Sequence, residues 1–401
     1  MAASLDILIV AGEASGDAHA GALMRELSGR LPRARFFGMG GVHMREAGLE
    51  ALFDAREISV MGLVEVLPKL WRILQVLRSL TRAAEERLPR LAILVDVPDF
   101  NLRLAKRLKR LGIPVVYYIS PMVWATREGR VKQIARDVDT VLCILPFEEA
   151  FLRERGVSAR YVGSPVLEHA PAPAPASVFR ERLGLDPGAT TLAVLPGSRE
   201  SELTRLMPTL VAAAERVARA RPGLQVVVPV APTLEKARVA AYFEKGPLCP
   251  RLVDGRAAEA VGASDAAIVC SGTATLEAAL MLRPLVVVYR VSWLTGLLVR
   301  MLARIAHVSL VNLLAGRRLV PELLQSECTA ERIAEVTLRY LDDEQERTSV
   351  VEGLMQVRAS LGAPGASAQA AEAVVSLLRR LDEAPAGART VEVPTSPSLI
   401  P

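Results

Sequence analysis

The sequence contains few aromatic residues and few cysteines, and both shortages exclude functions. Phe, Trp and Tyr make up 4% of the 401 residues, which argues against the stacking platforms that bind single-stranded nucleic acids. The four cysteines, Cys143, Cys249, Cys270 and Cys328, lie far apart and match no metal-binding or redox spacing. Cys143 and Cys270 fall in apolar, strand-like runs, so we interpret them as small core residues in a reducing cytoplasm.

Long uncharged apolar runs are also missing, and none is long enough to predict a helix that spans a bilayer. Asp6, Glu13 and Asp17 interrupt the region where a signal peptide would need an apolar core, so none is expected. The net charge of +5 comes from scattered Lys and Arg without a basic block, so nucleic acid is not an expected partner. We expect a soluble or peripheral protein that meets anionic small molecules or an anionic membrane surface.

The sequence does contain a repeated alternation of apolar strands and helices. With 401 residues, 51% of them apolar, two α/β domains are expected rather than one core. Non-alternating apolar runs predict buried parallel strands; they lie at Ile7–Val10, Leu91–Val95, Val115–Ile119, Val141–Leu145, Thr191–Leu195, Gln225–Val230, Ala266–Cys270 and Leu285–Tyr289. The pattern predicts two doubly wound, Rossmann-like domains facing across a cleft at the carboxyl ends of their strands.

Composition sets the expected domain boundaries. The Pro- and Ala-rich stretch Glu168–Ser177 is typical of a stiff linker, and the Pro-, Ser- and Thr-rich end of the chain is typical of a frayed tail. The expected divisions are an N-terminal domain over 1–170, a linker over 171–184, a C-terminal domain over 185–340, helices over 341–381 with the option of packing back on the first domain, and a flexible tail over 382–401.

Two turns in the first half carry candidate catalytic groups. The turn AGEASGD follows the first strand and offers Glu13 and Ser15 as substrate contacts; the alternative is a tight turn in which Asp17 caps the next helix, expected from about residue 19. In LVDVPDFN, Asp96 ends a buried strand, where a sheet presents residues to its ligand, and is the candidate base that activates a sugar hydroxyl. Asp99 precedes a helical run and is expected to be its N-cap.

Two turns in the second half point to a nucleoside diphosphate. LPGSR presents Arg199 at the end of a strand, where a guanidinium pairs with two phosphate oxygens; Glu202 is interpreted as a helix cap. In SGTATLE, Glu277 is placed to accept the ribose hydroxyls. The helix N-terminus in the same motif offers backbone N–H groups to a diphosphate; its candidate contacts are Ser271, Gly272 and Thr273.

Two further patterns admit more than one interpretation. Asn312 and Gln325 flank apolar runs in VNLLAGRRLVPELLQ, and the residues alone favour exposed helix termini. The segments Leu63–Leu80 and Trp293–Ile305 are amphipathic, basic and rich in Leu and Trp. They predict either helices that cover a sheet or helices that lie in a membrane interface.

Taken together, these motifs resemble one family, the lipid-A-disaccharide synthases. The matching stretches run in order over Ile7–Gln325: AGEASGD, VMGLVEVL, PDFN, SPMVWATR, LPFE, LPGSRESE, SGTATLE and NLLAGRRLVPELLQ. The resemblance implies a GT-B fold whose second domain binds UDP, with no metal and no cofactor. It implies transfer of 2,3-diacylglucosamine from UDP-2,3-diacylglucosamine to the 6-hydroxyl of 2,3-diacylglucosamine 1-phosphate (lipid X). The anomeric configuration inverts, giving a β-1,6 disaccharide and UDP.

The resemblance also implies site residues and a location. Asp96 matches the family's proposed base, and four residues match its nucleotide- and donor-contacting positions: Arg199, Glu277, Asn312 and Gln325. A cytoplasmic enzyme, peripheral on the cytoplasmic face of the inner membrane of a Gram-negative bacterium, is implied, and a homodimer stays open. Met122, Thr126 and Ser164 depart from the family pattern on the acceptor side.

Two other functions are compatible with the same motifs. A UDP-GlcNAc 2-epimerase uses a similar two-domain fold and nucleotide site, but it handles a water-soluble sugar and has no need of apolar faces such as Trp293–Ile305. A non-catalytic lipid- or nucleotide-binding protein would bind UDP without consuming a donor. Product analysis separates these three functions.

Overall fold

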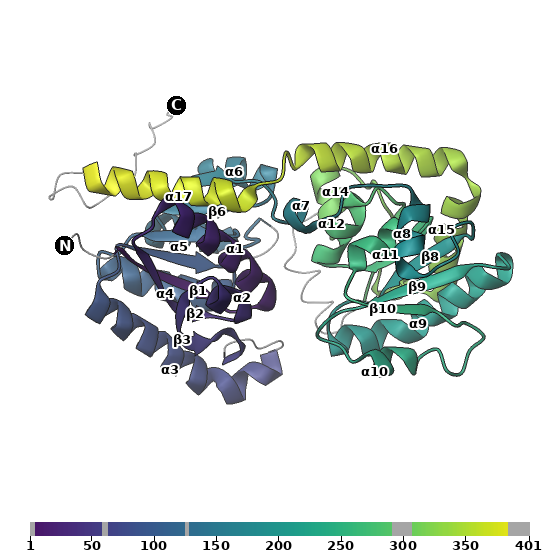
Figure 1. Ribbon diagram of the computed structural model, residues 1–401, viewed down its shortest axis with the longest axis horizontal. Helices are drawn as coiled ribbons and strands as arrows, with labels where there is room; N and C mark the ends of the chain where they lie inside the picture. Colours follow the sequence, from purple (N-terminus) through teal and green to yellow (C-terminus); the bar gives the residue numbers. More distant parts are fainter. Residues whose placement is uncertain (1–4, 58–62, 125–127, 291–306, 384–401) are drawn as a thin grey trace, which may run out of the picture. The chain divides into compact units, whose positions relative to one another are not determined.

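The computed structural model describes residues 5–57, 63–124, 128–290 and 307–383 (Figure 1). The chain forms two compact units, the first of residues 1–165 and 364–401 and the second of residues 166–363. Each unit has its own parallel sheet with helices on both faces. Within the described residues, no helix is long and apolar enough to cross a membrane.

The sheet of the first unit has seven parallel strands in the order β3-β2-β1-β4-β5-β6-β7. Their bounds are β1 Leu5–Ala11, β2 Ala34–Gly40, β3 Leu49–Asp54, β4 Leu91–Val95, β5 Val115–Tyr118, β6 Thr140–Cys143 and β7 Ala159–Tyr161. The central strands are buried on both faces, which explains why their sequences are apolar throughout instead of alternating.

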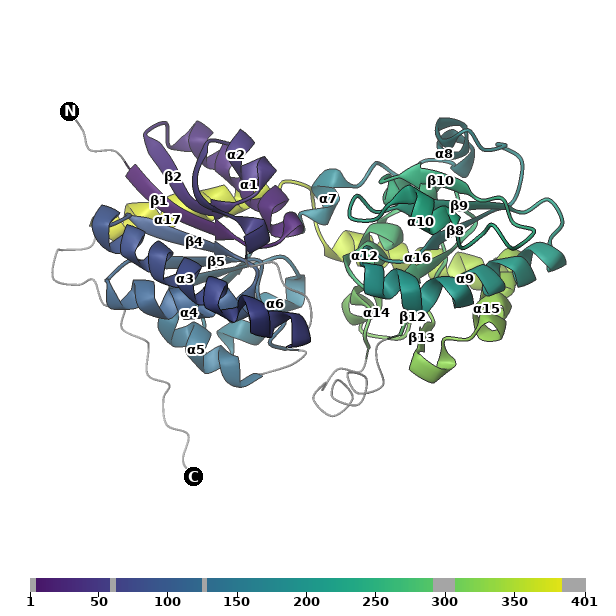
Figure 2. The same cartoon turned by 90° about the horizontal axis from the view of Figure 1, so that it is seen from below.

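Helices cover both faces of this sheet. The side chains of Leu8 and Val10 in β1 pack with α3 (Leu63–Arg87), α4 (Pro98–Arg110) and α5 (Val131–Asp137), which lie side by side in Figure 2. The alternate residues Ile7 and Ile9 pack on the other face with α1 (Ala14–Arg30) and α17 (Ala366–Glu383). The smaller helices are α2 (Val42–Glu46), α6 (Pro146–Arg153) and the 3-10 turns Ala55–Glu57 and Glu128–Arg130.

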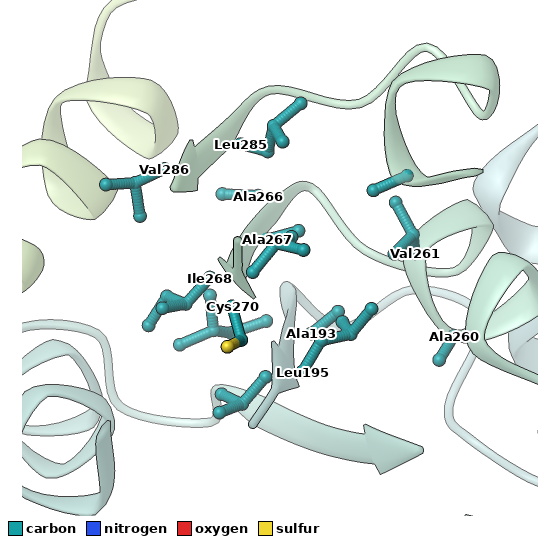
Figure 3. Close-up of a cluster of buried hydrophobic side chains, with 14 of the residues drawn as sticks. Ala193, Leu195, Ala260, Val261, Ala266, Ala267, Ile268, Cys270, Leu285 and Val286 are labelled. Atoms are coloured by element: carbon teal, nitrogen blue, oxygen red, sulfur yellow. The ribbon is translucent and has the colours of Figure 1, made fainter. Parts of the chain in front are cut away.

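The sheet of the second unit has six parallel strands in the order β10-β9-β8-β11-β12-β13. Their bounds are β8 Thr191–Leu195, β9 Gln225–Val230, β10 Arg251–Asp254, β11 Ala266–Cys270, β12 Leu285–Tyr289 and β13 Glu322–Leu324. Figure 3 shows the small and branched side chains of the centre of this core, among them Ala193, Ala267 and Ile268, with Val261 packed against them. Small residues here let the helices lie close to the sheet.

The helices of the second unit also fall into two groups. On one side α9 (Glu200–Ala220) packs against α15 (Ala330–Asp342). In the other group α12 (Thr273–Leu280) contacts α11 (Ala257–Gly262), α14 (Leu310–Ala315) and α16 (Glu344–Ser360). The remaining helices are α7 Val166–His169, α8 Ala176–Leu183, α10 Lys236–Ala240 and the 3-10 turn Gln325–Glu327.

Several details differ from the expectations. Part of the expected linker is helical, since residues 176–183 form α8, whose Phe179 and Leu183 are buried in the second core. The apolar pair at helical spacing outweighs the Pro-rich composition before it. The helix expected from about residue 19 begins at Ala14. The strands β2, β3, β7, β10 and β13 were not expected, because each is short or interrupted by Gly, Pro or charge.

The two amphipathic segments have different outcomes. In α3, Val76, Leu77 and Leu80 are buried against the sheet, whereas Trp71 is 68% exposed. The sheet-covering interpretation therefore holds for the second half of Leu63–Leu80 but leaves Trp71 without a place in the core. All of Trp293–Ile305 lies outside the described residues.

Candidate functional site

In the first unit, two of the candidate residues lie at the switch point of the sheet. Strands β1 and β4 are neighbours, and Ala11 pairs with Val95. The chain leaves β1 into α1 on one face and leaves β4 into α4 on the other, and doubly wound sheets bind their ligands at such a point. Glu13, the residue before α1, and Asp96, the residue after β4, are both placed there.

The backbone of the turn after β4 is strained. Asp96 and Val97 have φ values of 52° and 44°, in the left-handed region that costs a residue with a side chain about 1–3 kcal/mol. The turn is held by its neighbours, because the Tyr117 hydroxyl donates to the Asp96 carbonyl at 2.5 Å and Asn101 Nδ2 donates to the same oxygen at 2.8 Å. This anchoring fixes the backbone from which the Asp96 carboxyl projects. Strain of this kind is typical of functional sites.

The Asp96 carboxyl has the electrostatics of a poised base. Its pKa is raised to about 6, chiefly by burial and also by the negative charge of Glu13, while a backbone hydrogen bond from Val97 acts in the opposite direction. A base works best when its pKa lies near the working pH, because it is then ionised and still basic enough to take a proton. The structure thus brings Glu13 and Asp96 together, while Ser15 lies exposed in the first turn of α1.

The raised pKa of Asp96 predicts a pH-dependent cost in stability. A carboxyl whose pKa is higher in the folded state contributes favourably below its unfolded value of 3.8, and that contribution is lost as the pH rises through about 6. At pH 8 the Asp96→Asn variant should therefore be more stable than the unaltered chain. Its free energy of unfolding should be higher by up to about 3 kcal/mol, and its unfolding temperature by roughly 6 °C. The gap should nearly close at pH 4. Thermal unfolding of both proteins at both pH values measures this difference in unfolding temperature. A difference that is the same at pH 4 and pH 8 would contradict the raised pKa of Asp96.

Asp17 and Asp99 have other roles than expected. Asp17 does not cap its own helix: it lies in α1, and its carboxylate accepts hydrogen bonds from the backbone N–H groups of Gly41 at 2.7 Å and His43 at 3.0 Å, at the start of α2. Asp99 is not an N-cap, because α4 begins at Pro98; its carboxylate pairs with Arg130. Both acids therefore have other partners, which leaves Asp96 as the candidate base.

The second unit also has candidate residues at its switch point, between the neighbouring strands β8 and β11. Arg199 is the residue before α9, and its side chain is 47% exposed. Glu202 caps this helix as expected, since one carboxylate oxygen accepts from the backbone N–H groups of Ser198 and Arg199 at 3.0 and 3.2 Å. The other oxygen accepts from the Arg199 guanidinium at 3.2 Å, which aligns the cation with the turn.

Beside this turn, Gly272 is the residue before α12, and because it has no side chain the helix has no side-chain cap. Thr275 turns inward and donates to the Gly272 carbonyl at 2.7 Å. A helix N-terminus of this kind offers N–H donors and a partial positive charge to an anion. Ser271, Gly272 and Thr273 thus lie at the same sheet edge as Arg199, and Glu277 follows one turn into α12.

Tyr289 is a neighbour of this site that the sequence pattern did not single out. It ends β12, and burial raises the pKa of its hydroxyl, with the charge of Glu202 adding to the rise and Arg199 opposing it. Tyr289 pairs with Leu324 of β13, and Gln325 follows with a φ of 50°. Gln325 is therefore at the same edge of the sheet. The only signal for Tyr289 in the sequence was a polar tip at the end of an apolar run.

Asn312 is placed differently. It is fully buried, and its side-chain amide donates to Glu322 and Val320 while its oxygen accepts from the backbone N–H groups of Leu319 and Val320, all at 2.8–2.9 Å. Through these bonds the Asn312 side chain holds the segment between α14 and β13 in place. A direct contact of Asn312 with a ligand stays a prediction, and the geometry favours support of the loop that ends at Gln325.

Comparison with known proteins settles the family. A model of the family described as lipid-A-disaccharide synthetase matches residues 7–374. The chain belongs to the lipid-A-disaccharide synthase family. A family member from Myxococcus xanthus is 60% identical over 93% of this chain and 97% of its own length, and one from Syntrophus aciditrophicus is 43% identical over 94% and 98%. The predicted family is confirmed.

Solved structures show that this family member has the expected GT-B fold. The calicheamicin glycosyltransferase has a TM-score of 0.57 at 18% identity and covers 94% of this chain and 99% of its own. A UDP-N-acetylglucosamine 2-epimerase from Listeria monocytogenes has a TM-score of 0.60 at 12% identity, covering 96% and 98%. At such identities the likeness is one of fold alone.

Proposed function

We propose that this family member transfers 2,3-diacylglucosamine from UDP-2,3-diacylglucosamine to lipid X. Asp96 takes the proton from the 6-hydroxyl of lipid X as that oxygen bonds to the anomeric carbon of the donor. The bond from that carbon to the UDP oxygen breaks, and UDP leaves with the electron pair. Attack opposite the leaving group inverts the configuration and gives the β-1,6 disaccharide. The reaction uses no metal or cofactor in this proposal.

The observation that carries the proposal is the state of Asp96. This carboxyl follows β4 at the switch point, on a strained turn that Tyr117 and Asn101 hold, and its pKa is raised to about 6. The neighbouring acid Asp99, by contrast, is exposed and paired with Arg130. Hydrogen-bond reach and a pKa near the working pH are what a general base requires.

The second unit supplies the contacts for the nucleotide. We assign the diphosphate to the Arg199 guanidinium and to the N-terminus of α12 at Ser271, Gly272 and Thr273. These groups would also stabilise the negative charge that grows on the departing UDP. Glu277, Gln325 and, less directly, Asn312 complete the donor site in this proposal.

We further infer that the first unit meets a lipid surface. Trp71 in α3 is 68% exposed and Met122, after β5, is 58% exposed, and α3 also carries the exposed Arg72 and Arg78. Aromatic and basic side chains on one amphipathic helix suit the interface of an anionic membrane. This supports a peripheral enzyme on the cytoplasmic face of the inner membrane.

The test is a product analysis with purified chain. Radiolabelled UDP-2,3-diacylglucosamine and lipid X are incubated with the chain, and the expected product is a labelled disaccharide 1-phosphate that forms only when both substrates are present. Release of N-acetylmannosamine from UDP-GlcNAc without any disaccharide would favour the epimerase. Binding of UDP without consumption of either donor would favour a binding protein. Both outcomes would overturn the proposed reaction.

A further inference from the structure

Glu148 is a buried acid that the proposed chemistry leaves unused. It lies in the first turn of α6 and is 1% exposed. One carboxylate oxygen accepts from the Trp124 indole Nε1–H at 3.1 Å, and the other accepts from the backbone N–H of Leu145 at 3.2 Å. A buried carboxylate is costly unless hydrogen bonds compensate for its lost hydration. Capping of α6 accounts for only the second of these two bonds.

The hydrogen bond from Trp124 joins two turns at the sheet edge that carries Asp96. Trp124 lies in the turn after β5, and Glu148 follows β6. Strands β4, β5 and β6 are consecutive in the sheet, and the Asp96 N–H donates to the Tyr118 carbonyl at the end of β5 at 3.1 Å. The Trp124 ring also meets the Phe147 ring edge-on, with centroids 5.0 Å apart. The indole is therefore held by two neighbouring residues of α6, in the turn after β5, the strand next to β4.

We propose that Glu148 is a positioning residue that fixes Trp124 and, through it, the surface beside Asp96 on which the sugar acceptor lies. The inference rests on the proposed transfer reaction for the identity of the acceptor. It concerns the acceptor alone, because the donor's nucleotide is assigned to the second unit. Trp124 would offer a flat apolar face to the sugar or its acyl chains, and Glu148 would set the angle of that face.

The ionisation of Glu148 provides an independent signal of this contact. Burial raises its pKa to about 7, and the bonds from Trp124 and Leu145 oppose that rise. The titratable groups around it are Cys143 and Tyr161, whose pKa values are raised chiefly by burial and further by the charge of Glu148. The nearby charged groups on α6 are Glu149, which accepts from the Tyr161 N–H at 2.8 Å, and Arg153, which pairs with Glu149 at 2.8 Å. Glu149 and Arg153 thus form an ion pair with each other.

The first measurement follows the indole N–H groups by ¹⁵N–¹H correlation spectroscopy without any substrate. The chain has three tryptophans, and the signal missing from the Trp124→Phe variant identifies Trp124. We expect this signal to titrate with a midpoint near pH 7 and to stop titrating in Glu148→Gln. The Glu149→Gln variant, altered at the next position of α6, should leave the titration in place. A Trp124 signal that is the same in Glu148→Gln as in the unaltered chain at every pH overturns the inference, because Glu148 would then have no bond to the indole.

The second measurement separates positioning from catalysis. Glu148→Gln and Trp124→Phe should each raise the KM for lipid X about tenfold, the effect of one lost hydrogen bond, with kcat and the donor KM changed less than threefold. Trp124→Phe leaves the α6 cap intact, so it keeps the test valid if Glu148→Gln fails to fold. Glu149→Gln should keep the normal KM for lipid X.

The outcomes of the two measurements distinguish the inference from the proposed function. An unchanged KM for lipid X in both variants overturns the inference and leaves the proposed function standing. A fall in kcat equal to the fall in kcat/KM also overturns it, because Glu148 would then act in the chemical step. Failure of the unaltered chain to form disaccharide overturns the proposed function and, with it, the acceptor role. The indole titration needs no substrate, so it still tests the contact between Glu148 and Trp124 in that case.

Discussion

Replacement of Asp96 by alanine is expected to lower kcat by at least about 1,000-fold, within the range that a positioned general base contributes. The affinity for UDP should stay the same, because Asp96 belongs to the first unit and the nucleotide contacts are assigned to the second. The fold should also survive, since the Tyr117 and Asn101 bonds reach the Asp96 backbone carbonyl and alanine retains it. Disaccharide formation and UDP calorimetry on the same preparation measure both effects.

The matched control is Asp99→Ala. Asp99 is the neighbouring acid, but it is exposed and paired with Arg130 on the surface, where ion pairs contribute little. This variant should keep kcat within a few fold. Near-normal product formation by Asp96→Ala would remove Asp96 as the base, whatever the control does.

The second large effect is expected from Arg199→Ala, which should weaken UDP binding about 10- to 100-fold. This is the effect of losing a charge-assisted hydrogen bond to a phosphate. The helix α9 should persist, because Glu202 accepts from the backbone N–H groups of residues 198 and 199 and the alanine variant keeps both donors. Titration calorimetry with UDP measures the dissociation constant directly.

Arg219→Ala is the control for that variant. Arg219 lies in the last turn of the same helix, is exposed, and donates only to the Glu215 carbonyl in the described contacts. Its loss removes the same charge from the same helix without touching the proposed site. Equal UDP affinity in the Arg199→Ala variant and the unaltered chain would contradict the phosphate assignment, and equal weakening in both variants would reduce it to an effect of net charge.

Much of the fold could be predicted from the sequence. Five of the eight expected strands have the predicted bounds, including Leu91–Val95 and Thr191–Leu195, because a strand buried on both faces must be apolar at every position. The turns that follow those strands could therefore be named in advance. The short outer strands could not, since their sequences mix apolar residues with Gly, Pro and charge and owe their form to pairing with a neighbour.

The site could be predicted in part. Asp96 and Arg199 could be proposed because each lies in the turn after a buried strand, whereas the parts of Tyr117, Asn101, Glu148 and Tyr289 could not be predicted. Asn101 and Glu148 stood inside the family motifs, yet a polar residue in the first turn of a helix usually indicates solvent or a cap. Nothing local in the sequence indicates that the Asn101 amide holds a strained backbone or that Glu148 holds an indole.

The sequence by itself determined the positions of the main strands, the two-sheet architecture and the family, because all three follow from patterns within a few residues or from motifs in order. Only the tertiary structure decided which turns meet and what each acid does there. Asp17 acts on Gly41 across 24 residues and Glu148 on Trp124 across another 24. Burial and the charge of Glu13, in the turn after β1, raise the pKa of Asp96. Hydrogen-bond partners and desolvation depend on strand order, which local sequence does not encode.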